Sequence, residues 1–278
     1  MAKQSGIHQL KGKVGGMSYY QQSGVTDGLV RRINQGLSDR VKTGDEYANT
    51  RLNNDEFRRA AALVKPAFDA IMPRWRTMQR RFAFSNVLKG MLDSMKNDEG
   101  HAWGCRIPGE DMVLLYPVLF NELAKSGVYG DKYGVLTAAV DENNVDISVN
   151  LSAEQSAALL AEGIDGVIYT CAGVAIGVNA PSAGWSKQTG ELVYKKYTLT
   201  SATISVDGTA STQDIAVPVV ADSFLTNARV TALTACDNNA ILLILGMTPY
   251  RTIGSTNHIL QEKCTYVVFA FDSQDFEE

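Results

Sequence analysis

The residues that most often carry chemistry are few in this sequence and widely spaced. Its three histidines, His8, His101 and His258, include no pair four residues apart, so no single helix presents two imidazoles to a zinc ion. The H-E-x-x-H motif of metalloproteases, the G-x-S-x-G motif of serine hydrolases and the Walker phosphate loop are missing from the sequence. We therefore expect no catalytic residues, no metal site and no cofactor, and we interpret the chain as a non-enzymatic protein.

The remaining candidate motifs for catalysis or phosphate binding are weak, and ordinary turns explain them. Gly12-Lys13 is followed by Val14, where a phosphate-binding loop needs Ser or Thr. The acidic pairs Glu110-Asp111 and Asp141-Glu142 could serve general acid–base catalysis, but they fall in expected loops as solvated turn residues. Catalytic groups can also converge from distant positions, so an enzyme, such as a carbohydrate-active sandwich, stays an alternative.

The cysteines and the hydropathy pattern bear on where the protein works. Cys105, Cys171, Cys236 and Cys264 are far apart and form no C-x-x-C pair, so we expect four buried free thiols rather than disulfides or a zinc site. No stretch reaches the roughly 18 apolar residues that cross a bilayer, and Met1–Leu10 lacks the apolar core of a signal peptide. We expect a protein that is made in a cytoplasm and does not enter a membrane.

Charge is unevenly distributed along the 278 residues. Residues 1–100 hold 17 Lys and Arg against 10 Asp and Glu, whereas residues 101–278 hold 9 against 20. This distribution is consistent with three interpretations. The basic N-terminal part binds nucleic acid, or it contacts the acidic C-terminal part of a neighbouring copy, or the two parts are solvated faces of unlike charge. With 45% hydrophobic and 20% charged residues, the chain has the composition of a folded protein.

The elements that would position an interaction site begin with an extended N-terminal arm. Aromatic and polar residues predict a short strand over Met17–Tyr20, Asp27-Gly28 predicts a turn, and Leu29–Ile33 can pair back as a hairpin. An isolated hairpin is marginal in water, so this one needs a partner. Residues 34–53 are polar and we expect an irregular tether. As candidate interaction residues we select Tyr19 and Tyr20 as anchors and Arg31 and Arg32 as charge contacts.

Helical periodicity follows the arm. Asn54 or Asp55 can cap a helix, and Pro66 within it predicts a kink or two shorter helices. A second helical stretch is expected from about Arg76, followed by a loop over 97–110. Apolar residues recur every three or four positions in the first helix, at Phe57, Ala61, Val64, Phe68 and Ile71.

The pattern changes to strands from about residue 134. Apolar and polar residues alternate between Val145 and Leu151, and Ser152 with Gln155 resembles a capping box before a short helix. Gly166–Ile176 reads as a buried strand or strand pair. Many short strands separated by turn signals predict an antiparallel sandwich. Further strands are expected at Leu192–Thr200, Ala202–Val206, Ile215–Val220, Ala228–Cys236, Ala240–Leu245 and Cys264–Phe271.

These observations predict an α+β fold with three parts. Residues 1–53 form an extended arm with a β-hairpin, residues 54–130 a helical segment, and residues 131–278 an antiparallel β-sandwich domain.

The N-terminal part also resembles a known family. The motifs Leu10–Gly15, Ser18-Tyr19-Tyr20, Leu29–Arg32 and Asn49–Phe57 follow each other in order. This series is similar to a family of uncharacterised proteins of Bacteroidetes bacteria and their phages, which crAss-like phages carry among their virion structural genes. The likeness covers roughly residues 2–60, about a fifth of the chain; Arg58 departs from the small residue expected after the helix start.

The resemblance implies a structural subunit of a bacteriophage virion. We expect a ring or head-to-tail connector protein that contacts itself, as a homo-oligomer, and other virion proteins such as portal or tail subunits, after assembly in the cytoplasm of the bacterial host. Two alternatives remain: a decoration protein on the capsid surface, and a nucleic-acid-binding protein that uses the basic N-terminal part.

Overall fold

The computed structural model of the protein describes residues 2–4, 11–14, 17–20, 28–32, 37–75, 83–109, 111–123, 131–181, 191–220 and 224–276. The chain divides into two compact units, Met1–Asn53 (unit 1) and Asn54–Glu278 (unit 2). Helices and antiparallel sheets occur together, which confirms the predicted α+β class. No helix among the described residues combines the length and the apolar character that a membrane span requires.

Unit 1 contains a small antiparallel sheet. The predicted hairpin is confirmed, because β3 (Met17–Tyr20) pairs with β4 (Gly28–Arg32). The expected bare arm needs correction, since β1 (Ala2–Gln4) and β2 (Gly12–Val14) extend the hairpin to four strands in the order β1-β4-β3-β2. Each added strand has only three residues, too few for a readable alternation of apolar and polar side chains.

The expected irregular tether over 34–53 is wrong where the structure describes it. Residues Leu37–Thr43 form α1, Asp45–Tyr47 form a short 3₁₀ helix, and α2 begins at Ala48. These helices are solvent-facing almost throughout, so no apolar stripe marks them in the sequence.

Three helices form one layer of unit 2. Helix α2 (Ala48–Trp75) runs through Pro66 as one helix, so the predicted alternative of two shorter helices is wrong, and the helix begins before the cap predicted at Asn54 or Asp55. Helix α3 covers Ala83–Lys96, residues 97–109 form the predicted loop, and α4 (Met112–Leu123) was not predicted. The expected start near Arg76 lies outside the described residues.

The central sheet has five strands in the order β11-β10-β7-β8, with β12 also paired to β10. Strands β7 and β10, which pair with each other, are buried on both faces along most of their length and therefore read as largely apolar runs. Even-numbered side chains such as Leu242 and Val174 join a core with the three helices, and odd-numbered ones such as Leu243 join a second core. The strands are β7 (Gly166–Val178), β8 (Glu191–Ser205), β10 (Asn238–Ile253), β11 (Thr256–Ile259) and β12 (Thr265–Phe271).

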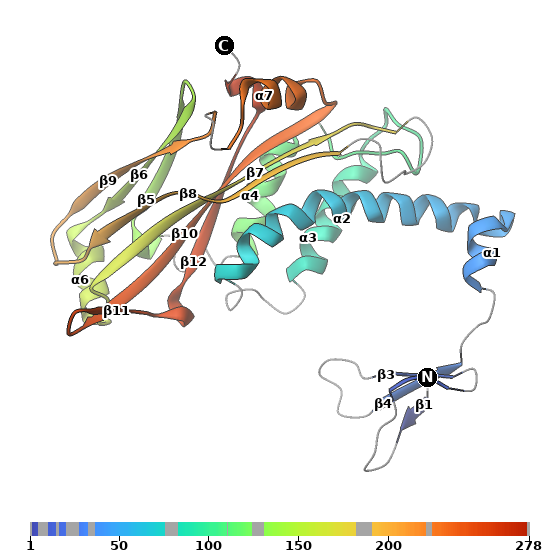
Figure 1. The fold of residues 1–278 in the computed structure, drawn as a ribbon, viewed down its shortest axis with the longest axis horizontal. Coiled ribbons are helices and arrows are strands. Elements are labelled where there is room, and N and C mark those ends of the chain that lie inside the picture. The colour runs from blue at the N-terminus through green and yellow to red at the C-terminus, as the bar shows by residue number, and fades with distance from the viewer. Residues whose placement is uncertain are drawn as a thin grey trace. The chain divides into compact units, whose positions relative to one another are not determined.

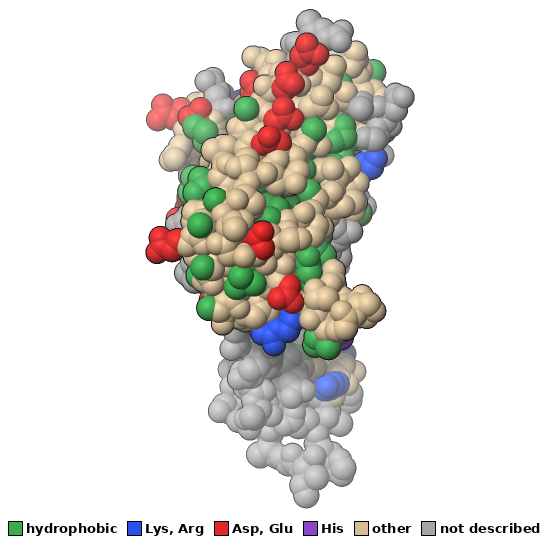
Figure 2. Space-filling view, turned by 90° about the vertical axis from the view of Figure 1, so that its left-hand side faces the viewer, with side chains coloured by type: hydrophobic (Ala, Val, Ile, Leu, Met, Phe, Trp, Pro, Cys, Tyr) green, Lys and Arg blue, Asp and Glu red, His purple; other side chains and the backbone are tan. Residues whose placement is uncertain are grey.

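A smaller antiparallel sheet covers the second core. It consists of β5 (Val135–Asp141), β6 (Asn144–Leu151) and β9 (Ser211–Pro218) in the order β5-β6-β9. The predicted alternation in β6 is confirmed, because Val145, Ile147 and Val149 are fully buried. In Figure 1 this sheet lies on one side of the central sheet and α2, α3 and α4 lie on the other. Figure 2 faces the outer side of the smaller sheet.

Short helices complete unit 2. Helix α6 (Ala153–Ala161) begins at the predicted capping box, in which Ser152 Oγ accepts from Gln155 N and Gln155 Oε1 accepts from Ser152 N. The strand predicted at Ala228–Cys236 is wrong, since α7 (Asn227–Thr234) occupies it. One-turn 3₁₀ helices lie at Asp131–Tyr133, Gln261–Lys263 and Ser273–Phe276.

The predicted strands at 192–200 and 202–206 are in fact one strand, β8. The predicted boundary at Ser201 lies within a continuous ladder to β7, because Ser201 pairs with Thr170 and Ala202 with Tyr169. A bulge lies earlier in the strand: between the register pairs Cys171↔Thr200 and Gly173↔Lys196, β8 holds two more residues than β7.

Candidate functional site

The four predicted interaction residues lie on adjacent strands but not on one face. Tyr19 pairs with Val30 and Tyr20 with Leu29 in the β3–β4 ladder. Because residues alternate between the two faces of a strand, Tyr19 shares a face with Arg32, and Tyr20 shares the opposite face with Arg31. The hairpin therefore divides the four residues into two pairs, each with one tyrosine and one arginine.

The sheet of unit 1 buries little of its surface. Tyr19 and Tyr20 are partly buried, and Leu29, at 8% exposure, is the one buried side chain among those described in this unit. A unit of 53 residues with so small a core gains little stability from apolar burial. Its faces are therefore candidate contact surfaces.

Polar contacts within unit 1 join its two helical pieces. Arg51 Nη1 donates to Gly44 O (2.7 Å) and to Val41 O (3.1 Å), which satisfies carbonyls at the end of α1. Arg40 pairs with Glu46 at 3.2 Å. A backbone hydrogen bond and the Arg40 guanidinium lower the pKa of the Glu46 carboxyl. This junction is ordered by charged side chains rather than by a core.

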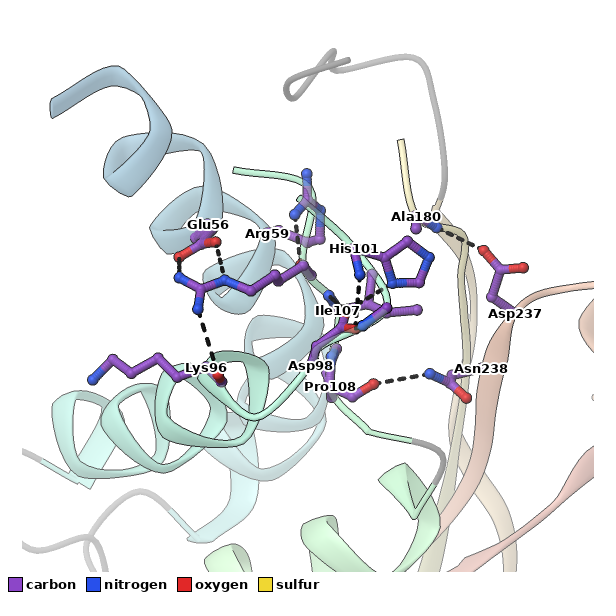
Figure 3. A network of polar contacts seen from close by, with 12 residues as sticks. Glu56, Arg59, Lys96, Asp98, His101, Ile107, Pro108, Ala180, Asp237 and Asn238 are labelled. Atoms are coloured by element: carbon purple, nitrogen blue, oxygen red, sulfur yellow. Dashed lines mark hydrogen bonds and ion pairs between the residues drawn. The ribbon is translucent and has the colours of Figure 1, made fainter. Parts of the chain in front are cut away.

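The densest polar network of unit 2 fixes the loop over 97–109 to α2 (Figure 3). Glu56 is buried on α2, and its carboxylate accepts from Arg106 Nε (2.7 Å) and Nη2 (2.9 Å). The same carboxylate accepts from Gly104 N at 2.9 Å. A bidentate pair with an added backbone donor compensates a buried carboxylate well.

Arg59 lies one turn further along α2 and is 2% exposed. It donates to Arg106 O (2.7 Å) and Gly104 O (3.2 Å) of the same loop. Burial lowers the pKa of its guanidinium, but an arginine stays charged at neutral pH, so these carbonyls serve as its compensating partners.

Asp98 and His101 form the second half of this network. Asp98 accepts from the backbone N–H groups of Gly100, His101 and Ile107 and from His101 Nδ1 at 2.8 Å. Partial burial raises the pKa of Asp98, but these hydrogen bonds outweigh it, so the net shift is downward. An Asp–His pair can orient an imidazole for catalysis; here the aspartate's other contacts are backbone groups that shape the loop.

One further contact ties this region to the central sheet, and a second joins the segments that flank β7 and β10. Asn238 Nδ2 of β10 donates to Pro108 O at 2.8 Å, and Asp237 accepts from Ala180 N at 2.8 Å (Figure 3). Glu56 and Arg59 thus bind backbone groups of the loop from α2, and Asp98 binds backbone groups within the loop itself. The network holds a loop in place, and the arrangement supports a structural role.

The other candidate residues are separate from one another. No group of three or more His, Cys, Asp or Glu side chains close enough to hold a metal ion is found in the described part of the chain. All four cysteines are free; Cys105, Cys171 and Cys264 are buried as predicted, whereas Cys236 is only half-buried. Burial raises the pKa of the Cys171 thiol to about 12. His258 is exposed on β11, and His8 lies outside the described residues.

Sequence reasoning missed Asn121, which completes the edge of the central sheet. Its Nδ2 donates to Val268 O (3.1 Å) and its Oδ1 accepts from Val268 N (2.7 Å), as a neighbouring strand would. Only the fold brings α4 beside β12, so no sequence spacing could reveal this contact.

Searches against protein-family models, curated proteins and solved structures find no match for the chain.

Proposed function

We propose that the chain is a non-enzymatic structural subunit of a bacteriophage virion, within a ring or connector of the head-to-tail or tail assembly. The observation that carries this proposal is the thin core of unit 1: four short strands with Leu29 alone buried among the described side chains. A sheet of this kind becomes stable when a partner covers it. The N-terminal resemblance to virion proteins supplies the biological setting.

The register of unit 1 gives each face of its sheet both apolar and basic residues. One face has Met17, Tyr19, Val30 and Arg32. The other has Lys13, Ser18, Tyr20, Leu29 and Arg31. The apolar and aromatic residues suit packing on another subunit, and the basic residues suit steering toward an acidic one.

The body of the proposed subunit is unit 2. Its two antiparallel sheets share one apolar core, and we interpret this pair as a β-sandwich with a layer of helices on its outer face. The two dense cores make unit 2 a rigid support, while unit 1 is the contact element. In a ring, such contacts are heterologous, because one surface of each subunit meets a different surface of the next.

The first test is the mass of the native protein in solution, measured by light scattering after size exclusion. The full chain should form a closed homo-oligomer, and a chain without residues 1–35, which lacks β1 to β4, should be monomeric and folded. A monomeric full chain would argue against self-assembly. An oligomer that persists after truncation would argue against unit 1 as the contact element.

A finer variant tests the predicted anchors. Replacing Tyr19 and Tyr20 together with Ala should weaken assembly and leave the thermal unfolding of unit 2 unchanged. Tyr47→Ala is the matched control, because Tyr47 lies in unit 1 but outside its sheet. Loss of the unit 2 transition in the double variant would assign the tyrosines to the fold instead.

A second candidate function is nucleic-acid binding by unit 1. Eight Lys and Arg stand against four Asp and Glu in residues 1–53, a net charge of +4. Phosphate-driven binding weakens steeply as salt rises. Fluorescence anisotropy with a labelled duplex at low and high salt tests it, and affinity that is absent or insensitive to salt would remove this candidate.

A further inference from the structure

We infer that the edge strand β5 and the outer face of the β5-β6-β9 sheet form the surface on which the N-terminal unit of a second copy of this chain docks. This inference rests on the proposed function, because it names the acceptor surface for the assembly argued above. Three features of the structure support it: which sheet edges are paired, how completely the core is buried, and how charge is distributed between the two units.

The sheet edges of unit 2 are not equally protected. The Asn121 carboxamide occupies the edge of β12 at Val268, and β8 and β9 lie in contact with each other. Strand β5 pairs with β6 over seven residues, and no strand pairs with its other side among the described residues. An open edge of this length is a template for a further strand.

The core beneath β5 is incompletely covered. Its inward side chains Leu136, Ala138 and Val140 are only partly buried, although their partners on β6 are fully buried. Val135, at the start of the strand, is 54% exposed. A neighbouring strand alongside β5 would remove this apolar surface from water, which favours docking.

A hollow continues the surface at the start of β5. Its volume is about 390 Å³, and Val135, Asn150 and Thr212 are among the residues that line it. These three residues lie in one row across the sheet, on its outer face. The hollow can accept a side chain of the docked unit.

The outer face of this sheet is acidic. Asp141, Asp146 and Asp214 lie on it by register, and β5, β6 and β9 contain no Lys or Arg. Figure 2 shows Asp and Glu side chains in a row on this side of the molecule, with Lys and Arg confined to the lower part and one edge. Such a face repels phosphates and attracts a basic partner.

The chain itself supplies that partner. Unit 1 has a net charge of +4, whereas unit 2, with 18 Lys and Arg against 26 Asp and Glu, has −8. The two edge strands of the unit 1 sheet, β1 and β2, contain Lys3 and Lys13. Lysine on an edge disfavours pairing with a like edge but complements an acidic one. Unit 1 of a second copy therefore matches this surface in both backbone and charge.

The test compares two substitutions at one exposed position of β5, made in the full chain. Thr137 lies on the outer face, in register with Ser148, whose Oγ donates to Asp214 at 2.6 Å. Thr137→Lys should weaken assembly at least tenfold, measured as the concentration for half-dissociation by light scattering. Thr137→Glu, the matched control, should assemble as the wild type does, and both should keep the wild-type unfolding midpoint.

The outcomes separate this inference from the proposed function. If both variants assemble normally while removal of residues 1–35 dissolves the oligomer, the β5 surface is wrong and assembly through unit 1 stands. If both variants weaken assembly equally, unit 1 as the charge-matched occupant is overturned. A full chain that is monomeric at all concentrations overturns both. Carbodiimide crosslinking of mixed isotope-labelled and unlabelled chains should join Lys3 or Lys13 to Asp141, Asp146 or Asp214; links to other surfaces alone would overturn the assignment.

Discussion

Unit 1 and unit 2 support their sheets in opposite ways. The central sheet of unit 2 has apolar side chains on both faces and two cores to receive them. The sheet of unit 1 has Leu29 as its one buried side chain among those described, and Arg51 and Arg40 order its helical junction. The difference in buried apolar surface means that unit 2 has cores of its own, whereas on the assembly proposed above unit 1 would gain its stability from a partner.

The largest expected effect comes from the same substitution made in both units. Leu243→Ala in β10 removes a fully buried side chain from the core between the sheets, and should lower the free energy of unfolding of unit 2 by about 2–5 kcal/mol. Leu29→Ala in β4 should leave that transition unchanged and weaken the oligomer. Calorimetry and light scattering measure the two effects. A similar decrease in the free energy of unfolding of unit 2 in both variants would mean that the two units unfold together, which would contradict their independence.

The second prediction concerns the edge of the central sheet that Asn121 covers. Asn121→Leu leaves the N–H and C=O of Val268 without the partners that the carboxamide provides, at a cost of about 1–3 kcal/mol. It also opens the β12 edge, so the variant should aggregate at concentrations at which the wild type does not. Glu122→Gln, at an exposed neighbouring position of α4, is the control. Urea unfolding and turbidity measure both effects; an unchanged midpoint would show that this edge needs no cover.

A substitution at Asp98 tests whether the hydrogen-bond network of the 97–109 loop stabilises unit 2. Asp98→Asn replaces one carboxylate oxygen by a donor that faces backbone N–H groups, and should cost about 1–3 kcal/mol at pH 7. Asp93→Asn, at an exposed aspartate that pairs with Lys96, should change little.

The pH dependence of the Asp98 effect has a definite sign. Hydrogen bonds lower the pKa of Asp98 in the folded state, so its contribution is complete above the unfolded-state pKa of about 4 and is lost as pH falls through the lower folded value. The difference between wild type and Asp98→Asn should thus shrink as pH falls below about 4. A difference that grows in acid would contradict the assignment.

Sequence patterns predicted the elements whose stabilising contacts are local or strictly alternating. The β6 strand, the Ser152 cap and the β3–β4 hairpin are of this kind. Helix α4 was missed because its run from Met112 to Phe120 is apolar almost throughout and has a proline inside it, which hides the helical period. The Val and Thr residues of 228–236 suggested a strand, but Val230 and Leu233, three apart, are the pair that the fold buries.

The candidate surfaces were less predictable than the elements. Tyr19, Tyr20, Arg31 and Arg32 could be selected by residue type, but their division between two faces depends on register. The open edge of β5 depends on which strands the topology places beside it. Edge status and cover are properties of the assembled sheet, so no local pattern reports them.

The smallest expected effect concerns a single helix cap in unit 2. Ser152→Ala removes the hydroxyl that accepts from Gln155 N at 3.1 Å, and should lower the free energy of unfolding by about 1 kcal/mol in urea titration. Ser152→Thr keeps the hydroxyl and should stay close to the wild type. Ser152 also lines the hollow at the start of β5, so the oligomer mass of Ser152→Ala reports on docking there, whereas its urea midpoint reports on the helix cap. If Ser152→Ala dissociated the oligomer without moving the urea midpoint, the hydroxyl would belong to the docking surface and not to the stability of unit 2.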